Sequence, residues 1–393
     1  MDFLRETLDQ LAQAGLLRTT RSVESAQGAV VRVDGRDAVC LCSNNYLSLA
    51  SRPELVEAAA EAARRFGCGG GASRLVSGTM ALHEELEAAI ARLKSREAAL
   101  LFPTGYMANV GAISALVAKG DAVAVDKLNH ASIIDGCRLS GARLLVCGHR
   151  DPQRLDDALA SAAGLRRRLA VTDSVFSMDG DIAPLPELAD ACRRHGAMLM
   201  IDEAHATGVI GETGRGTEEY FGAQPADVVM GTLSKALGSL GGFVAGSREL
   251  IGLLRNTARS FIYTTSLPPP VCAASLAAIE LISRDTGPLR RLRSNIALLD
   301  RLLREAGLAD AGSPAAPAAQ HLTPIFPVVI GDAARAMQVS RRLFEAGCLC
   351  PAIRPPTVPA GTSRLRVSLQ SDHTEEQIRG FVIALREALR LSR

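Results

Sequence analysis

The sequence predicts an α/β protein with a mainly parallel β-sheet in a large domain, followed by a smaller C-terminal α+β domain. Between about residues 80 and 250, short continuous apolar runs alternate with stretches of helical periodicity. Continuous apolar runs indicate strands that are covered on both faces, as in a parallel sheet. The runs are AALLF (98–102), AVAV (122–125), ARLLVC (142–147), RLAVTD (168–173), AMLMID (197–202) and DVVMGT (227–232).

The pattern changes after about residue 285, where RDTGP interrupts a helix. Three later runs predict strands, and an Ala- and Pro-rich stretch at 312–320 predicts a loop. The three runs are IFPVVI (325–330), CLCPAI (348–353) and SRLRVSLQ (363–370). We therefore divide the chain into an N-terminal helix and strand segment (1–45), a large domain (46–285) and a small C-terminal domain (286–393).

Composition and charge argue against several classes of protein. With 47% hydrophobic and 22% charged residues, the chain has the profile of a soluble globular protein. A net charge of +2 gives no bulk attraction to nucleic acid or to membranes. Residues 1–18 mix charged and apolar residues at helical spacing, which predicts an amphipathic helix rather than a signal peptide. The nine cysteines are scattered and odd in number, so we expect reduced thiols, a cytoplasmic location and no metal site.

A lysine in the stretch GTLSKALGSLGG (231–242) is the first candidate for chemistry. Arginine supplies most of the basic charge of this chain, and the lysines are Lys94, Lys119, Lys127 and Lys235. Lys235 follows a predicted strand and precedes a Gly-rich turn. Because desolvation lowers the pKa of a lysine, an amine placed here could act as a nucleophile. An ordinary turn lysine is the alternative.

Asp202 and His205 follow a predicted buried strand in LMIDEAHATG. An isolated buried charge is costly, so Asp202 needs a cationic or hydrogen-bonding partner. The protonated ring nitrogen of pyridoxal phosphate (PLP) is one such partner, because an acid at that position keeps the ring an electron sink. His205 would then lie near the phenolic oxygen of the ring. A helix cap or a salt bridge is the alternative for Asp202, and a metal site would lack ligands.

Two loops after predicted strands could contact the same cofactor. In FPTGYMANVGAISAL (102–116), Thr104 can cap a helix, and the backbone N–H groups of Gly105 and Tyr106 form an anion site. In DKLNHAS (126–132), His130 could stack on a cofactor ring, although a loop histidine is often structural. The chain has neither a G-x-S-x-G nucleophile elbow nor a P-loop.

Taken together, these motifs resemble the fold-type I PLP-dependent enzymes and, among them, the α-oxoamine synthase family. Members of that family condense an amino acid with an acyl thioester and release carbon dioxide. The similarity covers nearly the whole chain, in the family's order. It includes SNNYLSLA (43–50), GASRLVSGTMALHEELE (71–87), DSVFSMDGDIAPL (173–185) and IDEAHATGVIGETGRG (201–216).

The resemblance implies a role for individual residues. Lys235 would form the Schiff base with PLP and act as general base and acid, while Asp202 pairs with the ring nitrogen and His205 bonds the ring oxygen. His130 would stack on the ring and belong to both the catalytic and the substrate-binding residues. Further contacts to PLP are implied for Ser177, Gly105, Tyr106, Thr232 at the phosphate and Thr264 from a neighbouring subunit. Contacts to substrate are implied for Arg366 at the carboxylate, Asn44, Thr357 and Arg18.

Two stretches are similar to the biotin-pathway branch of the family, namely FIYTTSLPP (261–269) and AIRPPTVPAGTSRLRVS (352–368). This similarity implies L-alanine and a pimeloyl thioester, on coenzyme A (CoA) or on an acyl carrier protein, as substrates. Asn45 and Ser48 stand where many members of that branch have Asp and Gly, and Asn45 is similar to the branch that uses acetyl-CoA.

The alternatives are therefore glycine with acetyl-CoA or succinyl-CoA, a PLP aminotransferase, or a non-catalytic partner subunit. The resemblance also implies a homodimer, with the loop GCGGGASRLVSG (67–78) near its boundary.

Overall fold

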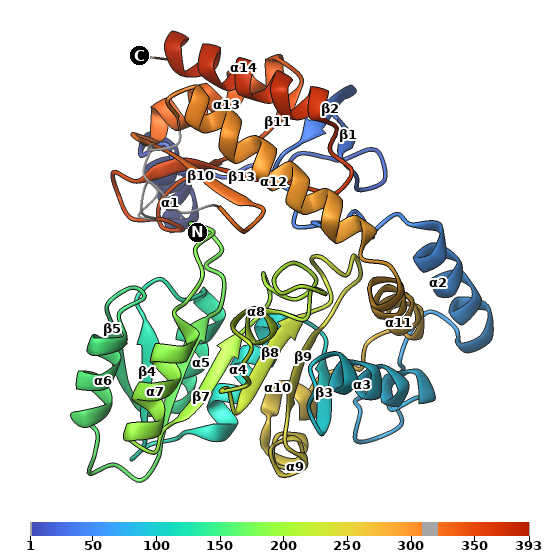
Figure 1. Cartoon of the computed structure of the whole chain (residues 1–393), viewed down its shortest axis with the longest axis vertical. Helices are drawn as coiled ribbons and strands as arrows, with labels where there is room; N and C mark the ends of the chain where they lie inside the picture. The colour runs from blue at the N-terminus through green and yellow to red at the C-terminus, as the bar shows by residue number, and fades with distance from the viewer. Residues whose placement is uncertain (1, 309–320, 393) are drawn as a thin grey trace. The chain divides into compact units, whose positions relative to one another are not determined.

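The computed structural model describes residues 2–308 and 321–392, so the loop predicted at 312–320 lies outside the described residues. The chain divides into two compact units (Figure 1). The large unit comprises Leu49–Ser177 and Asp181–Leu289. The small unit takes the described residues of Met1–Ser48, Met178–Gly180 and Arg290–Arg393. The N-terminal residues thus group with the C-terminal ones.

A seven-stranded sheet lies at the centre of the large unit, in the order β3-β9-β8-β7-β6-β4-β5. Its strands are β3 (Ala98–Phe102), β4 (Ala122–Asp126), β5 (Arg143–Cys147), β6 (Arg168–Asp173), β7 (Met198–Asp202), β8 (Val228–Thr232) and β9 (Gly242–Gly246). The pairs from β8 to β5 are parallel, while β9 is antiparallel to both of its neighbours. The mainly parallel sheet is confirmed. The sequence pattern does not predict β9, because a glycine at each end makes that stretch resemble a turn.

Helices cover both faces of this sheet, as the continuous apolar runs predict (Figure 1). Val123 and Val125 of β4 share one apolar cluster with residues of three helices: α4 (Gly105–Leu116), α5 (Ala131–Ser140) and α9 (Arg248–Thr257). Ala124 faces the other way and clusters with residues of α6 (Pro152–Ala160) and α7 (Leu185–Arg194). Two cores, one on each face, therefore hold the sheet rigid.

The large unit contains further helices. They are α2 (Pro53–Phe66), α3 (Ala81–Leu93), α8 (Thr217–Phe221), α10 (Arg259–Ile262) and α11 (Pro269–Arg284). Helix α11 packs against both α2 and α3, and α3 also packs against β3.

The small unit contains two three-stranded sheets, β1-β2-β11 and β10-β13-β12. Their strands are β1 (Val30–Val33), β2 (Arg36–Cys40), β10 (Ile325–Gly331), β11 (Cys348–Leu349), β12 (Ala352–Ile353) and β13 (Ser363–Ser368). The unit also holds α1 (Asp2–Gln13), most of α12 (Gly287–Glu305), α13 (Ala333–Glu345) and α14 (Glu375–Leu391). The single strand predicted at 348–353 is wrong, because the chain leaves one sheet for the other around Pro351, which has no N–H to donate.

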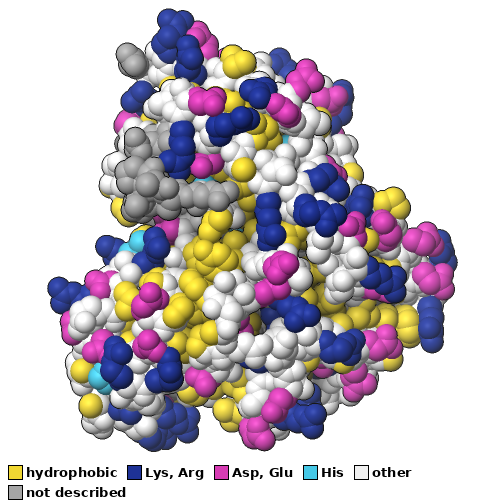
Figure 2. All heavy atoms as spheres, in the orientation of Figure 1, with side chains coloured by type: hydrophobic (Ala, Val, Ile, Leu, Met, Phe, Trp, Pro, Cys, Tyr) yellow, Lys and Arg dark blue, Asp and Glu magenta, His cyan; other side chains and the backbone are white. Residues whose placement is uncertain are grey.

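Basic and acidic side chains are interspersed over the face of the molecule seen in Figure 2, in keeping with the small net charge of +2. No helix within the described part of the chain has both the length and the apolar character needed to cross a membrane.

A glycine close to Lys235 provides a test of the packing. Gly238 has φ +66°, and a Cβ atom there would lie 2.5 Å from the backbone nitrogen of Ala50. We expect Gly238→Ala to lower the free energy of unfolding by about 2–4 kcal/mol, because it combines left-handed strain with overpacking. Gly252, inside α9, has no atom within 4 Å of the same position, so Gly252→Ala should raise stability by about 0.5–1 kcal/mol. Urea unfolding of both variants measures the contrast, and equal effects would contradict it.

Candidate active site

Each of four neighbouring parallel strands of the large sheet ends in a polar residue. Asp126, Asp173, Asp202 and Thr232 are the last residues of β4, β6, β7 and β8, and all four are buried. Asp173 and Asp202 are direct neighbours in the register of β6 and β7. The carboxyl ends of parallel strands form one edge of a sheet, where ligands bind in open α/β folds.

Lys235 lies in a tight turn directly after β8. The N–H of Leu233 donates to the carbonyl of Gly241 at 2.9 Å, and the N–H of Ser239 donates to the carbonyl of Leu233 at 2.9 Å. The half-buried Lys235 places its Nζ 3.0 Å from Nε2 of His205, which is 5% exposed. The structure therefore brings together the two residues that the sequence places thirty positions apart.

Asp202 is a buried carboxylate that is 3% exposed. Its Oδ1 accepts a hydrogen bond from the N–H of Ala204 at 2.8 Å, and its Oδ2 accepts one from Nδ2 of Asn109 at 2.8 Å. A buried carboxylate needs a compensating charge, so the protonated ring nitrogen of PLP fits this position.

Asp173 and His130 lie beside this carboxylate. Oδ2 of Asp173 accepts a hydrogen bond from the N–H of His130 at 2.8 Å. Burial, and then repulsion from Asp202, raises the pKa of Asp173 well above its ordinary value. Partial burial lowers the pKa of His130, although Asp202 opposes that effect. A neutral imidazole with part of its surface exposed suits stacking on a cofactor ring.

Two further residues at this site, Asn109 and Ser132, are not predicted from the sequence. Nδ2 of Asn109 also donates to Oγ of Ser132 at 2.9 Å, and this Oγ lies 2.7 Å from Nδ1 of His130. Asn109 and Ser132 are fully buried, so they hold Asp202 and His130 in place. The only signal in the sequence is their position within FPTGYMAN and NHAS, two motifs already assigned to the cofactor.

The start of helix α4 meets the end of β8. Thr104 caps this helix, accepting a hydrogen bond from the N–H of Met107 at 3.1 Å, as predicted. A Cβ atom on Gly105 would lie 3.6 Å from Thr232 and 3.0 Å from Met230. The free backbone N–H groups at this helix start thus lie against Thr232, an arrangement that suits a phosphate group.

The structure places three other candidates around this region. The hydroxyl of Tyr106 donates a hydrogen bond to Asp135 on α5. Ser177 is half-buried in the segment between β6 and α7. Thr264 precedes Thr265, which forms an isolated bridge with Ser73; the segment of Thr264 therefore lies beside the 67–78 loop.

In the small unit, hydrogen bonds through a tyrosine link Arg366 to Asn44. This tyrosine is not among the residues predicted from the sequence. Nη2 of Arg366 donates to the hydroxyl of Tyr46 at 3.1 Å, and this hydroxyl donates to Oδ1 of Asn44 at 3.0 Å. Nη1 of Arg366 donates to Oγ of Ser368 at 2.8 Å. Arg366 is 7% exposed and lies on β13, so its guanidinium is rigidly held.

Thr357 and Arg18 also lie together in the small unit. Nη2 of Arg18 is 3.4 Å from Oγ1 of Thr357, and both residues are exposed. Arg354 donates hydrogen bonds to the carbonyls of Gly15 and Leu17. The N-terminal segment is thus attached to the loop that precedes β13.

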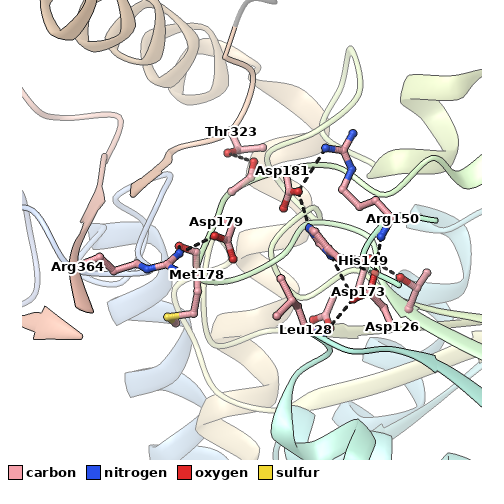
Figure 3. Close-up of polar contacts among 12 residues, drawn as sticks. Asp126, Leu128, His149, Arg150, Asp173, Met178, Asp179, Asp181, Thr323 and Arg364 are labelled. Carbon is pink, nitrogen blue, oxygen red and sulfur yellow. Dashed lines mark hydrogen bonds and ion pairs between the residues drawn. The ribbon is translucent and has the colours of Figure 1, made fainter. Parts of the chain in front are cut away.

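A histidine outside the predicted set bridges two buried carboxylates (Figure 3). Nδ1 of His149 lies 3.1 Å from both carboxylate oxygens of Asp126, and Nε2 lies 2.8 Å from Oδ2 of Asp181. Nη1 of Arg150 approaches the same Asp181 oxygen at 3.3 Å. Burial disfavours the charged ring, but the hydrogen bonds to Asp126 and Asp181 outweigh it and raise the pKa of His149 to about 9.

Fold and site together define a fold-type I PLP-dependent enzyme. The model of the family "Aminotransferase class I and II" matches residues 36–385. The chain belongs to that family.

Curated relatives called 8-amino-7-oxononanoate synthase match nearly the full length of the chain. The protein from Geobacter sulfurreducens is 52% identical over 381 residues, which cover 96% of this chain and 95% of the relative. The protein from Anaeromyxobacter dehalogenans strain 2CP-1 is 52% identical over 390 residues, covering 99% and 96%.

Solved structures agree on the fold. Serine palmitoyltransferase from Sphingomonas wittichii has a TM-score of 0.91 at 33% identity and covers 100% of this chain and 97% of its own. An 8-amino-7-oxononanoate synthase from Francisella tularensis has a TM-score of 0.76 at 28% identity, covering 90% and 98%. A further serine palmitoyltransferase, from S. paucimobilis, carries a PLP-myriocin aldimine and has a TM-score of 0.92 at 33% identity, covering 100% and 98%.

The charge on His149 provides a test by pH. The folded pKa of about 9 lies above the ordinary value of 6.5, so this ring stabilises the fold fully below pH 6.5 and loses that effect as the pH rises through 9. The stability advantage of the wild type over His149→Gln should therefore shrink by about 3 kcal/mol between pH 6 and pH 10. Urea unfolding at both pH values measures it. An advantage that stays constant would mean that the ring is not charged.

Proposed function

We propose that the protein condenses L-alanine with a pimeloyl thioester to give 8-amino-7-oxononanoate, carbon dioxide and a free thiol, a step of biotin synthesis. The observation that carries this proposal is the 52% identity, over nearly the full length, to relatives named for that activity. The cluster of Lys235, His205 and Asp202 supports it, because it supplies the groups that a PLP enzyme needs.

The departure at Ser48 concerns the conformation of a turn. Ser48 has φ +55°, a conformation that glycine adopts without strain. Its Oγ accepts a hydrogen bond from the N–H of Asp372 at 3.3 Å, and its N–H donates to the carbonyl of Asn45 at 2.8 Å. The difference between serine and glycine here concerns the backbone of a turn rather than contact with a substrate.

Bound PLP would supply an electron sink for a carbanion at the α-carbon of the amino acid. Asp202 would hold the ring nitrogen protonated, and its two hydrogen bonds, from Asn109 and Ala204, fix its orientation. The N–H groups at the start of α4 and the hydroxyl of Thr232 would hold the phosphate.

Lys235 would remove and return the proton at the α-carbon. His205 lies 3.0 Å from its Nζ and can exchange a hydrogen bond with the amine in either protonation state. Arg366 would hold the carboxylate of the amino acid, a planar anion that a guanidinium binds with two parallel hydrogen bonds. Tyr46 and Asn44 would set the orientation of that guanidinium.

We also propose a homodimer located in the cytoplasm. Large apolar side chains are exposed in the 67–78 loop and next to Thr264, the residue expected to reach a neighbouring subunit. They are Leu75, Val76 and Tyr263, which are 51%, 81% and 72% exposed. Helix α1 likewise exposes Phe3 and Leu8, at 65% and 54%. Apolar side chains of this size on a surface indicate a protein partner, and a second copy of the chain is the one that the family resemblance implies.

A substrate competition tests the proposed reaction. PLP-loaded protein receives L-alanine, glycine and L-serine together with pimeloyl-, acetyl-, succinyl- and palmitoyl-CoA, and mass spectrometry identifies the products. We expect the mass of 8-amino-7-oxononanoate to dominate, and Lys235→Ala to form none of the products because it lacks the base. L-serine and palmitoyl-CoA are included because several of the solved structures are serine palmitoyltransferases.

A dominant product from glycine or from L-serine would keep the enzyme class and replace the substrate assignment. Turnover by Lys235→Ala at the wild-type rate would reject the catalytic role of Lys235.

The oligomeric state is tested by light scattering coupled to gel filtration. We expect about twice the chain mass of 41.4 kDa. Val76→Asp should shift the distribution toward the monomer, because a charge would be buried at the interface. Ile383→Asp is the matched control, since Ile383 is 72% exposed on α14, away in sequence from the proposed boundary. A wild-type monomer would overturn the proposal.

A further inference from the structure

His149 joins two turns that each carry a proposed cofactor residue. It follows β5 and is directed between the carboxylates of Asp126 and Asp181 (Figure 3). The side chains of His149, Asp126 and Asp181 are 13%, 8% and 7% exposed. None of the three is used by the proposed reaction, and buried charged groups of this kind are costly unless they are paired.

Asp126 shapes the turn that leads to His130. Its Oδ1 accepts a hydrogen bond from the N–H of Leu128 at 2.8 Å, and its carbonyl accepts one from the N–H of Asn129 at 3.1 Å. Its Oδ2 accepts one from the N–H of Arg150 at 2.7 Å, which ties the turn after β5 to the same carboxylate. The position of His130 therefore depends on the orientation of Asp126.

Asp181 closes the turn that displays Ser177. Its carbonyl accepts a hydrogen bond from the N–H of Phe176 at 3.0 Å, and the neighbouring residues Val175 and Ile182 form a bridge. The ring of Phe176 also packs edge-on against His149, with ring centroids 4.5 Å apart and an interplanar angle of 84°. His149 thus contacts both arms of the turn around Ser177.

We infer that His149 is a positioning residue, which holds the turn of His130 and the turn of Ser177 in the arrangement that binds PLP. A protonated imidazole donates one hydrogen bond to each carboxylate and separates two anions that would otherwise repel. This inference rests on the proposed function and on the cofactor contacts that the family resemblance implies for His130 and Ser177. His149 itself acts through these two turns.

The test is the affinity of the protein for PLP in the absence of substrate. Cofactor-free protein is titrated with PLP while the absorption band of the bound cofactor is followed. His149→Gln keeps one donor nitrogen but loses the charge, and an acceptor oxygen replaces the second donor nitrogen. We therefore expect PLP binding to weaken by roughly tenfold or more, the size of effect found when the outer hydrogen-bond partners of a bound metal are changed. The band should also shift in position, because the surroundings of the ring change.

His195→Gln is the matched control, because His195 also bonds an aspartate, with its Nε2 3.1 Å from Oδ1 of Asp156, between α6 and α7. It should bind PLP like the wild type. Both variants are measured at a temperature where circular dichroism shows them folded, so that a loss of stability alone leaves the affinity unchanged. PLP affinity equal to the wild type in His149→Gln would overturn the inference.

A double variant separates positioning from general damage. Asp181→Asn removes the charge from the Ser177 end only, so it should weaken PLP binding less than His149→Gln. The two changes break the same link, so the double variant should bind about as weakly as His149→Gln alone. Independent, additive losses would contradict the inference. Since no substrate is present, an error in the proposed substrate leaves these outcomes intact.

Discussion

The charge of Asp202, buried at the carboxyl end of a central strand, is the constraint on which the site depends. A carboxylate with so little contact with water is stable only where hydrogen bonds and a cation compensate it. Asn109 and the N–H of Ala204 supply the hydrogen bonds. Asp173, its neighbour in the sheet, has a raised pKa and so takes up a proton more readily. Protonation of Asp173 would remove the repulsion between its carboxyl group and that of Asp202.

The next residue along the chain anchors this strand end. Glu203 and Lys94 form an ion pair at 2.6 Å, with side chains 1% and 2% exposed. Glu203 also accepts hydrogen bonds from the N–H and the hydroxyl of Thr217 at 2.6 and 2.5 Å. Such a network costs free energy on burial, but once fully satisfied it fixes one geometry. The polar groups around Asp202 thus lose contact with water on folding, and their hydrogen bonds to one another hold them in a defined orientation.

The proposed site residues are drawn from both units of the chain, and the chain resembles two groups of enzymes. The residues proposed to hold the cofactor and move the proton, such as Lys235 and Asp202, belong to the large unit. Arg366, Tyr46 and Asn44 belong to the small unit. Enzymes of one fold can share a cofactor and its carbanion chemistry while their substrates differ, so the fold alone leaves the substrate open.

The sequence by itself determined the parallel sheet, its helical cover and the residues most closely tied to chemistry, because continuous apolar runs and short motifs are local patterns. The sequence did not predict strand β9, because the glycines at its two ends are typical of a turn. Only the tertiary structure showed that Asn109 holds Asp202, that Tyr46 links Arg366 to Asn44, and that His149 lies between two aspartates. These contacts join residues that are distant in the chain, and they exist only once packing has brought the strand ends together.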